Sequence, residues 1–202
     1  SATSTLAGAI TIGADATVKG NLTTGAGAIT VGKKSHVNGS IKTIAGVVTI
    51  GAGATVLGGI NNQDTSKAGA VTIGEDSIVV GTIITSAGAI TVGTRSQVGG
   101  GILAEDGAIT VGAGSTVSGS VCTGNSGAIT IGAGSRIMGN VETKTAGAIT
   151  VGSNSVVSGG VKVHAAGATT IAASATVGAL NASSCLEVPA ENPLAGKLSI
   201  KT

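Results

Sequence analysis

The side chains that most often perform catalysis or bind metals are few in this chain and far apart. Its two histidines, His36 and His164, belong to repeats near opposite ends of the sequence. Two acidic pairs, Glu75-Asp76 and Glu105-Asp106, are expected at hydrated turns of different repeats, which argues against paired-carboxylate catalysis. A metal site needs a cluster of ligands. We therefore expect surface histidines, no enzyme activity, no metal and no cofactor.

Composition argues against several further functions. Glycine-rich stretches are common, but none has the Gly-x-x-x-x-Gly-Lys-Ser/Thr spacing of a phosphate-binding loop. The net charge is only +2 and the chain has no Phe, Tyr or Trp, so basic tracks and base-stacking platforms for nucleic acid are missing. No apolar run approaches the roughly 18 residues of a membrane span. We expect neither nucleic-acid binding nor membrane insertion.

The dominant feature is a phrase close to Gly-Ala-Ile-Thr-Ile/Val-Gly that is written nine times. Successive copies are separated by 19, 19, 23, 19, 19, 20, 20 and 20 residues. A period in this range is typical of a solenoid, in which each repeat forms one coil and the coils stack. The copies begin at Gly8, Gly27, Gly46, Gly69, Gly88, Gly107, Gly127, Gly147 and Gly167.

Aligning the copies gives four apolar columns of mostly β-branched residues. In the first two repeats these columns hold Ile10 and Ile29, Ile12 and Val31, Val18 and Val37, and Leu22 and Ile41. Apolar residues two or four positions apart have the period of a strand. The sequence therefore predicts an all-β, single-stranded parallel β-helix (β-solenoid) of about nine coils of 19–20 residues over 1–181.

A glycine column separates the third and fourth apolar columns. Its parity predicts that these glycines face inward, where a missing side chain lets opposite walls approach and makes the cross-section thin. The column is Gly20, Gly39, Gly58, Gly81, Gly100, Gly119, Gly139 and Gly159.

The repeats give way to a tail at 182–202. Pro189 and Pro193 cannot donate to a strand ladder, so stacking is expected to stop there. Leu198 and Ile200 lie on one face of a predicted terminal strand, which either docks on a neighbouring subunit by strand addition or caps its own last coil.

The two cysteines leave three alternatives open. Cys122 is expected at an outward position of the sixth coil, and Cys185 lies at the base of the tail. Three coil heights, roughly 14 Å, separate their natural positions, which is too far for a disulfide unless the tail folds back. Folding back, pairing between molecules and two unpaired thiols are all compatible with the sequence, and the second would lock the tail between subunits.

One outward surface repeats more regularly than any other. Threonine occupies the same position in all nine copies, and alanine precedes it by two residues in every copy but the third, which has Val47. No charge interrupts either column. The threonines are Thr11, Thr30, Thr49, Thr72, Thr91, Thr110, Thr130, Thr150 and Thr170, and the alanines include Ala28, Ala89, Ala108 and Ala128.

Three interpretations of this surface compete. In the first, the surface is regular only because Thr and Ala are compatible with strands and were copied by repeat duplication. Alternatively, the flat uncharged surface packs against another rod. Finally, a threonine ladder at ~4.8 Å intervals holds ordered water and binds ice.

The repeat resembles those of two known families. The phrase Ile/Val-Gly-x-x-Ala/Ser-x-Val-x-Gly-x-apolar at 12–22 and 111–121 is similar to the repeat of bactofilins, β-helical proteins that polymerise end to end without nucleotide. It also resembles Gly-Ala-x-Thr-Val-Gly tracts that accompany some bacterial secreted ice-binding-family proteins. The likeness covers residues 8 to about 181.

These observations lead to one preferred function and one alternative. Only seven residues precede the first phrase, too few for a helix cap, so an open first coil is expected to template another subunit. A start at Ser1 indicates removal of a signal peptide. The sequence thus predicts a secreted, extracellular or cell-surface structural protein that assembles head to tail with itself into a filament. The alternative is an antifreeze protein that binds the ice surface through the Thr/Ala face.

Overall fold

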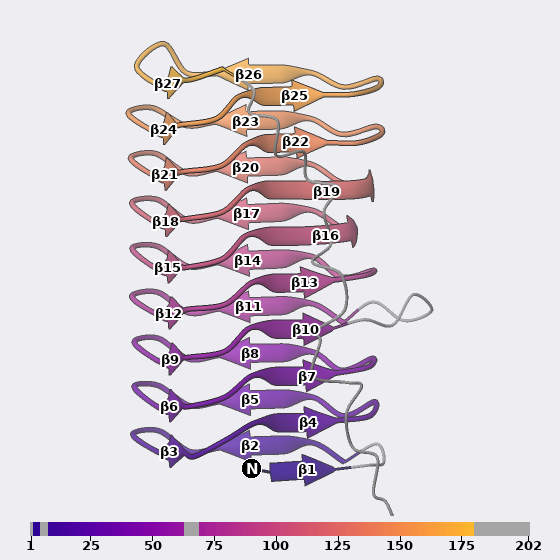
Figure 1. Cartoon of the computed structure of the whole chain (residues 1–202), viewed down its shortest axis with the longest axis vertical. Helices are drawn as coiled ribbons and strands as arrows, with labels where there is room; N and C mark the ends of the chain where they lie inside the picture. Colours follow the sequence, from indigo (N-terminus) through magenta and orange to yellow (C-terminus); the bar gives the residue numbers. More distant parts are fainter. Residues whose placement is uncertain (1, 5–7, 63–68, 180–202) are drawn as a thin grey trace, which may run out of the picture.

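The computed structural model describes residues 2–4, 8–62 and 69–179, and these form a β-solenoid (Figure 1). All twenty-seven described strands pair in parallel, in three sheets of nine strands. Each coil contributes one strand to sheet B, then one to sheet C, then one to sheet A, and the next coil repeats the order. The predicted fold is therefore confirmed.

The strands are short because each coil turns at three corners. Sheet B contains β2 (Ile10–Ile12), β5 (Ile29–Val31), β8 (Val48–Ile50), β11 (Val71–Ile73), β14 (Ile90–Val92), β17 (Ile109–Val111), β20 (Ile129–Ile131), β23 (Ile149–Val151) and β26 (Thr169–Ile171). Sheet C contains β3 (Thr17–Val18), β6 (His36–Val37), β9 (Thr55–Val56), β12 (Ile78–Val79), β15 (Gln97–Val98), β18 (Thr116–Val117), β21 (Arg136–Ile137), β24 (Val156–Val157) and β27 (Thr176–Val177). Sheet A contains β1 (Ala2–Ser4), β4 (Leu22–Thr24), β7 (Ile41–Thr43), β10 (Ile60–Asn62), β13 (Ile83–Thr85), β16 (Ile102–Asp106), β19 (Val121–Ser126), β22 (Val141–Thr143) and β25 (Val161–Val163).

The core consists of ladders of β-branched side chains, one step per coil. In the second coil Ile29, Val37 and Ile41 are 0% exposed, and the matching residues of coils three to seven are 0–1% exposed. Fully burying one such side chain stabilises the fold by roughly 1.5–3 kcal/mol. The four apolar columns of the sequence therefore form the core, with each alternate residue pointing outward.

The glycine column between sheets C and A does not serve the purpose predicted for it. A Cβ on Gly39 would lie 2.5 Å from the carbonyl carbon of Gly20, and one on Gly81 would lie 2.5 Å from the backbone nitrogen of Gly59. These contacts are with the backbone of the preceding coil, and not with the opposite wall. Glycine is required at this corner because coils stack there backbone on backbone.

Buried serines support the corner between sheets B and C. The Ser96 hydroxyl donates to the carbonyl of Gly74 in the preceding coil (2.9 Å), and the Ser77 backbone N–H donates to the Ser96 hydroxyl (3.2 Å). Equivalent bonds to a glycine carbonyl recur along the rod. The serines are Ser35, Ser77, Ser96, Ser115, Ser135 and Ser155. This ladder satisfies backbone groups that the turns leave unpaired.

At the same corner, one residue of most coils has a left-handed backbone conformation, with a positive φ. Lys34 has φ 56°, Arg95 has φ 55° and Gly114 has φ 68°. L-residues with a side chain adopt this region at a cost of about 1–2 kcal/mol. The full set is Asp15, Lys34, Gly53, Asp76, Arg95, Gly114, Gly134 and Asn154.

Irregular spacing in the sequence leaves sheet B in register. Thr49 pairs with Thr72 although 23 residues separate them, because the insertion follows β10. Within the insertion, Asn61 and Asn62 belong to β10, and residues 63–68 lie outside the described residues. Glu105-Asp106, predicted at a turn, instead ends strand β16, which pairs with β19 through a register shift. Strand β1, which the sequence did not predict, extends sheet A by one strand.

Candidate functional site

The nine threonines of the repeat lie at the central, outward position of sheet B. Each is the Cα partner of the threonine in the next coil, from Thr11 and Thr30 to Thr150 and Thr170. Eight of them are exposed and Thr49 is half-buried. The structure thus brings all nine residues into one continuous column, which we call the threonine column.

Small residues flank the threonine column on one side. Ala28, Ala89, Ala108 and Ala128 are exposed, and Val47 is the one larger residue of this row, at 43% exposure. A glycine follows each threonine by two residues in the first eight coils. The surface made of these rows, which we call the threonine face, therefore carries no charged residue and no long side chain except Val47.

The other two sheets provide an internal comparison. The outward position of sheet C holds threonine in four strands of nine, alongside His36, Ile78 and Arg136. The corresponding position of sheet A holds threonine in two, alongside Lys42 and Leu103. Strand propensity and repeat duplication act on all three sheets alike, so neither explains why sheet B alone is invariant.

The threonine column runs straight along the long axis of the rod. Figure 1 shows the strands of sheet B, from β2 to β26, stacked one above another. Neighbouring strands lie ~4.8 Å apart, so eight intervals extend the column over roughly 38 Å. Most large sheets twist, and flat ones rely on stacked side-chain ladders such as those of this core. The threonine column is therefore regular, with one threonine per coil in unbroken register.

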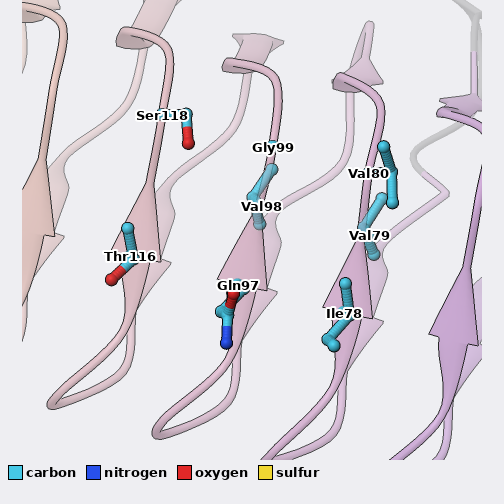
Figure 2. Close-up of a pocket in the computed structure, with 8 residues that line it drawn as sticks. All are labelled: Ile78, Val79, Val80, Gln97, Val98, Gly99, Thr116 and Ser118. Carbon is cyan, nitrogen blue, oxygen red and sulfur yellow. The ribbon is translucent and has the colours of Figure 1, made fainter.

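A shallow hollow lies on the outward face of sheet C, where the side chains differ from coil to coil. Figure 2 shows it between Val80 and Ser118, where Gly99 leaves a gap in the column. Ile78 and Val80 at its rim are 38% and 49% exposed. Its lining lacks charged groups, so it has no polar anchor for a charged ligand.

An exposed ion pair lies at a turn. Arg95 donates from Nε and Nη2 to the two carboxylate oxygens of Asp76, both at 2.7 Å, and from Nη2 to Glu75 at 3.2 Å. The hydrogen bond from Arg95 holds the pKa of the Asp76 carboxyl below its ordinary value. All three groups are exposed. The turn at Glu75-Asp76, which was expected to be hydrated, thus forms an ion pair with Arg95 of the next coil.

The histidines occupy different environments. His36 lies exposed in β6, as expected. His164 is also exposed, as expected, and its Nε2 lies 3.0 Å from Oε2 of Glu142, whose Oε1 accepts a hydrogen bond from Asn140 (2.9 Å). Glu142 is buried, at 5% exposure, although its position in sheet A points outward. No sequence pattern indicated this contact, because strand parity does not predict which outward side chains are buried.

Other candidate sites are few within residues 2–4, 8–62 and 69–179. These residues include no group of three or more His, Cys, Asp and Glu arranged to hold a metal ion. They also include no helix of a length and apolarity suited to crossing a membrane.

The cysteines are only partly described. Cys122 lies in β19 at the expected outward position, but it is 4% exposed and disulfide-bonded. This excludes the alternative of an unpaired Cys122 thiol. Cys185, Leu198 and Ile200, assigned to the tail in the sequence analysis, lie outside the described residues.

Comparison with known proteins adds no identification. No family model, no curated protein and no solved structure matches the chain.

Proposed function

We propose that this protein binds ice through the threonine face. The observation that carries the proposal is the invariance of the exposed threonine column in sheet B, set against the variable outward positions of sheets A and C. With this function we propose an extracellular location and no catalysis.

The chemistry of the face suits an ordered water layer. Each threonine offers one hydroxyl donor and acceptor next to a methyl group, and the hydroxyls repeat at the ~4.8 Å strand spacing. Charged side chains would orient water around themselves and break that order, and the face has none. A rigid column also loses little conformational entropy when it binds, because β-branched side chains are restricted at χ1.

Matched substitutions on two faces of the same coils test the proposal. Thr91→Lys with Thr110→Lys places two long charges on the threonine face, whereas Gln97→Lys with Thr116→Lys places them on sheet C of the same coils. We expect thermal hysteresis and shaped ice crystals from the native protein and the sheet C variant, and neither from the face variant. Equal activity in both variants would refute the assignment to sheet B.

Head-to-tail self-association is a second candidate, favoured by the last coil. Ile171 in β26 is 43% exposed, whereas Ile131 and Val151 in the same inward column are each 1% exposed. An exposed inward side chain and an unpaired strand edge are the features that another coil would cover. The likeness to bactofilin repeats supports the same structural, filament-forming function.

Electron microscopy and light scattering across a dilution series distinguish the two candidates. Filaments that disappear in Ile171→Lys but persist in Thr91→Lys/Thr110→Lys support end-to-end assembly. Monodisperse monomers at high concentration would remove it and leave ice binding as the function.

A further inference from the structure

Charged side chains occupy only part of the corner between sheets B and C. The turns of this corner stack along one edge of the rod (Figure 1), and the tip of each turn holds two successive residues. In coils six to nine these pairs carry no charge, and they are Ala113-Gly114, Ala133-Gly134, Ser153-Asn154 and Ala173-Ser174. In coils one to five the pairs are Ala14-Asp15, Lys33-Lys34, Ala52-Gly53, Glu75-Asp76 and Thr94-Arg95. We call the tips of these first five turns the charged edge.

The signs of the charges on the charged edge are antisymmetric about the third coil. Coil two carries two lysines and coil four carries two acids, one coil to either side of the neutral pair Ala52-Gly53. Two coils to either side, Asp15 and Arg95 occupy the same position of their pairs. Reversing the direction of the rod therefore places every charge opposite a charge of the other sign. A two-fold interface between identical chains requires this kind of self-complementarity.

Ion pairs within the chain account for only one half of this pattern. Arg95 pairs with the two acids of coil four, at 2.7 Å from Asp76 and 3.2 Å from Glu75. Among the described residues, neither Lys33 nor Lys34 lies in an ion pair, and both side chains are exposed. The acids of coil four are exposed as well. The charged edge thus presents two lysines and two acids to solvent, separated by one neutral coil.

We propose that two copies of this chain associate side by side and antiparallel through the charged edge, around a two-fold axis at coil three. The lysines of coil two in one copy then face the acids of coil four in the other, and Asp15 faces Arg95. Ala52 and Gly53 lie at the axis, where short side chains let the two backbones approach. Coils six to nine extend beyond the overlap at both ends of the dimer.

The size of the charged edge predicts a weak dimer. Its five coils cover four intervals, or roughly 19 Å, which is short for a standard interface of about 800 Å² per partner. Ile78 begins sheet C next to this edge in coil four and adds apolar area, at 38% exposure. Exposed ion pairs are individually weak and are screened by salt. We therefore expect the dimer to dissociate on dilution and at high ionic strength.

The dimer places the two threonine faces on the same side. Sheets B and C meet at the charged edge and therefore face opposite sides of it. A two-fold axis perpendicular to the rods and to the line that joins them leaves directions along the axis unchanged. Both copies therefore turn sheet B to one side of the dimer, which doubles the threonine face. This consequence rests on the proposed ice binding, whereas the dimer itself does not.

Charge reversal on either side of the axis tests the pairing. Sedimentation equilibrium of the native chain in low salt is expected to show a species of twice 18.8 kDa in exchange with the monomer. Lys33→Glu/Lys34→Glu and Glu75→Lys/Asp76→Lys each bring like charges together, and each is expected to weaken the dimer about tenfold or more. An equimolar mixture of the two variants is expected to form a mixed dimer, because each reversed pair then meets its opposite.

A matched control and the mixture keep this test decisive. Ser153→Glu/Asn154→Glu adds charges to the same corner in coil eight, outside the overlap, and is expected to dimerise like the native chain. Recovery of the dimer in the mixture shows that both reversed chains are folded, and circular dichroism checks each alone. A native chain that stays monomeric at the highest attainable concentration in low salt would overturn the proposal. A native dimer that neither reversal weakens would place the interface elsewhere and would overturn it equally.

Cross-linking tests the antiparallel direction. With a short bis-maleimide, Ala52→Cys is expected to link to itself at the axis, with the native protein as the control for its own cysteines. Thr94→Cys is expected not to link to itself, because the two copies of coil five lie four intervals apart, roughly 19 Å, but to link when mixed with Ala14→Cys. Self-linking of Thr94→Cys would indicate parallel rods and overturn the proposal.

Thermal hysteresis separates this inference from the proposed function. Monomeric Lys33→Glu/Lys34→Glu is expected to give less hysteresis than the native protein at equal chain concentration, because its threonine face is half as wide. A native dimer without hysteresis would remove ice binding and leave the dimer. Hysteresis from a chain that never dimerises would leave ice binding and remove the dimer.

Discussion

The buried serine ladder gives the sharpest prediction for stability. Ser96 is 0% exposed, donates to the Gly74 carbonyl and accepts from the Ser77 backbone N–H. Ser96→Ala removes one hydroxyl and leaves the buried Ser77 N–H and the half-buried Gly74 carbonyl without this partner. A typical hydrogen bond contributes about 0.5–1.5 kcal/mol net, and a buried unsatisfied group costs about 1–3 kcal/mol. We expect the free energy of unfolding to fall by about 2 kcal/mol.

A reciprocal substitution and a surface control sharpen the test. The third coil has Ala54 at the serine position, also 0% exposed. Ala54→Ser is expected to stabilise by about 0.5–1.5 kcal/mol by gaining the bond to the preceding coil. Ser118→Ala on the exposed face of sheet C is expected to change stability by less than about 0.5 kcal/mol.

Thermal and urea unfolding measure these differences. For a chain of this size, 1 kcal/mol corresponds to a shift of roughly 2–4 °C in Tm. Ser96→Ala is therefore expected to melt several degrees below the native protein while Ala54→Ser melts above it. If Ser96→Ala matched Ser118→Ala, the corner would not depend on the ladder and the reasoning would be wrong.

Three further predictions concern the core and the turns. Ile109→Ala is expected to destabilise by about 2–5 kcal/mol, because the side chain is fully buried and its neighbours cannot close the cavity, as urea unfolding will show. Gly114→Ala is expected to destabilise by about 1–2 kcal/mol and Lys34→Gly to stabilise by up to about 1 kcal/mol, since both positions are left-handed; equal Tm values would contradict this. NMR titration is expected to show the pKa of the Asp76 carboxyl below its ordinary value in the native protein and nearer that value in Arg95→Gln. Any folding stability that the ion pair contributes is present above the ordinary pKa of the carboxyl and is lost as the pH falls through the lowered pKa.

The sequence predicted the core more completely than the surface. β-Branched residues at a period of two specify which side chains point inward, and the repeat specifies that successive coils stack, so the positions of Ile29 and Val37 followed directly. The invariant outward column containing Thr91 was equally predictable, because successive side chains of a strand point to opposite faces of the sheet.

Interactions between coils were harder to predict. The serine ladder depends on a glycine carbonyl one coil away, and serine at a turn has many local explanations. Lys34 and Arg95 in left-handed turns were missed because their side chains do not favour that region. The burial of Cys122 and Glu142 was missed because strand parity gives the direction of a side chain but not what covers it.

Ice-affinity partitioning tests the central claim most directly. A slowly growing ice crystal is formed in a solution of the native protein, the threonine-face variant Thr91→Lys/Thr110→Lys and the matched sheet C variant Gln97→Lys/Thr116→Lys, each carrying a different label. If the threonine face binds ice, the native protein and the sheet C variant are incorporated into the ice while the face variant stays in the liquid. Exclusion of all three from the ice, or equal incorporation of all three, would contradict ice binding by the threonine face.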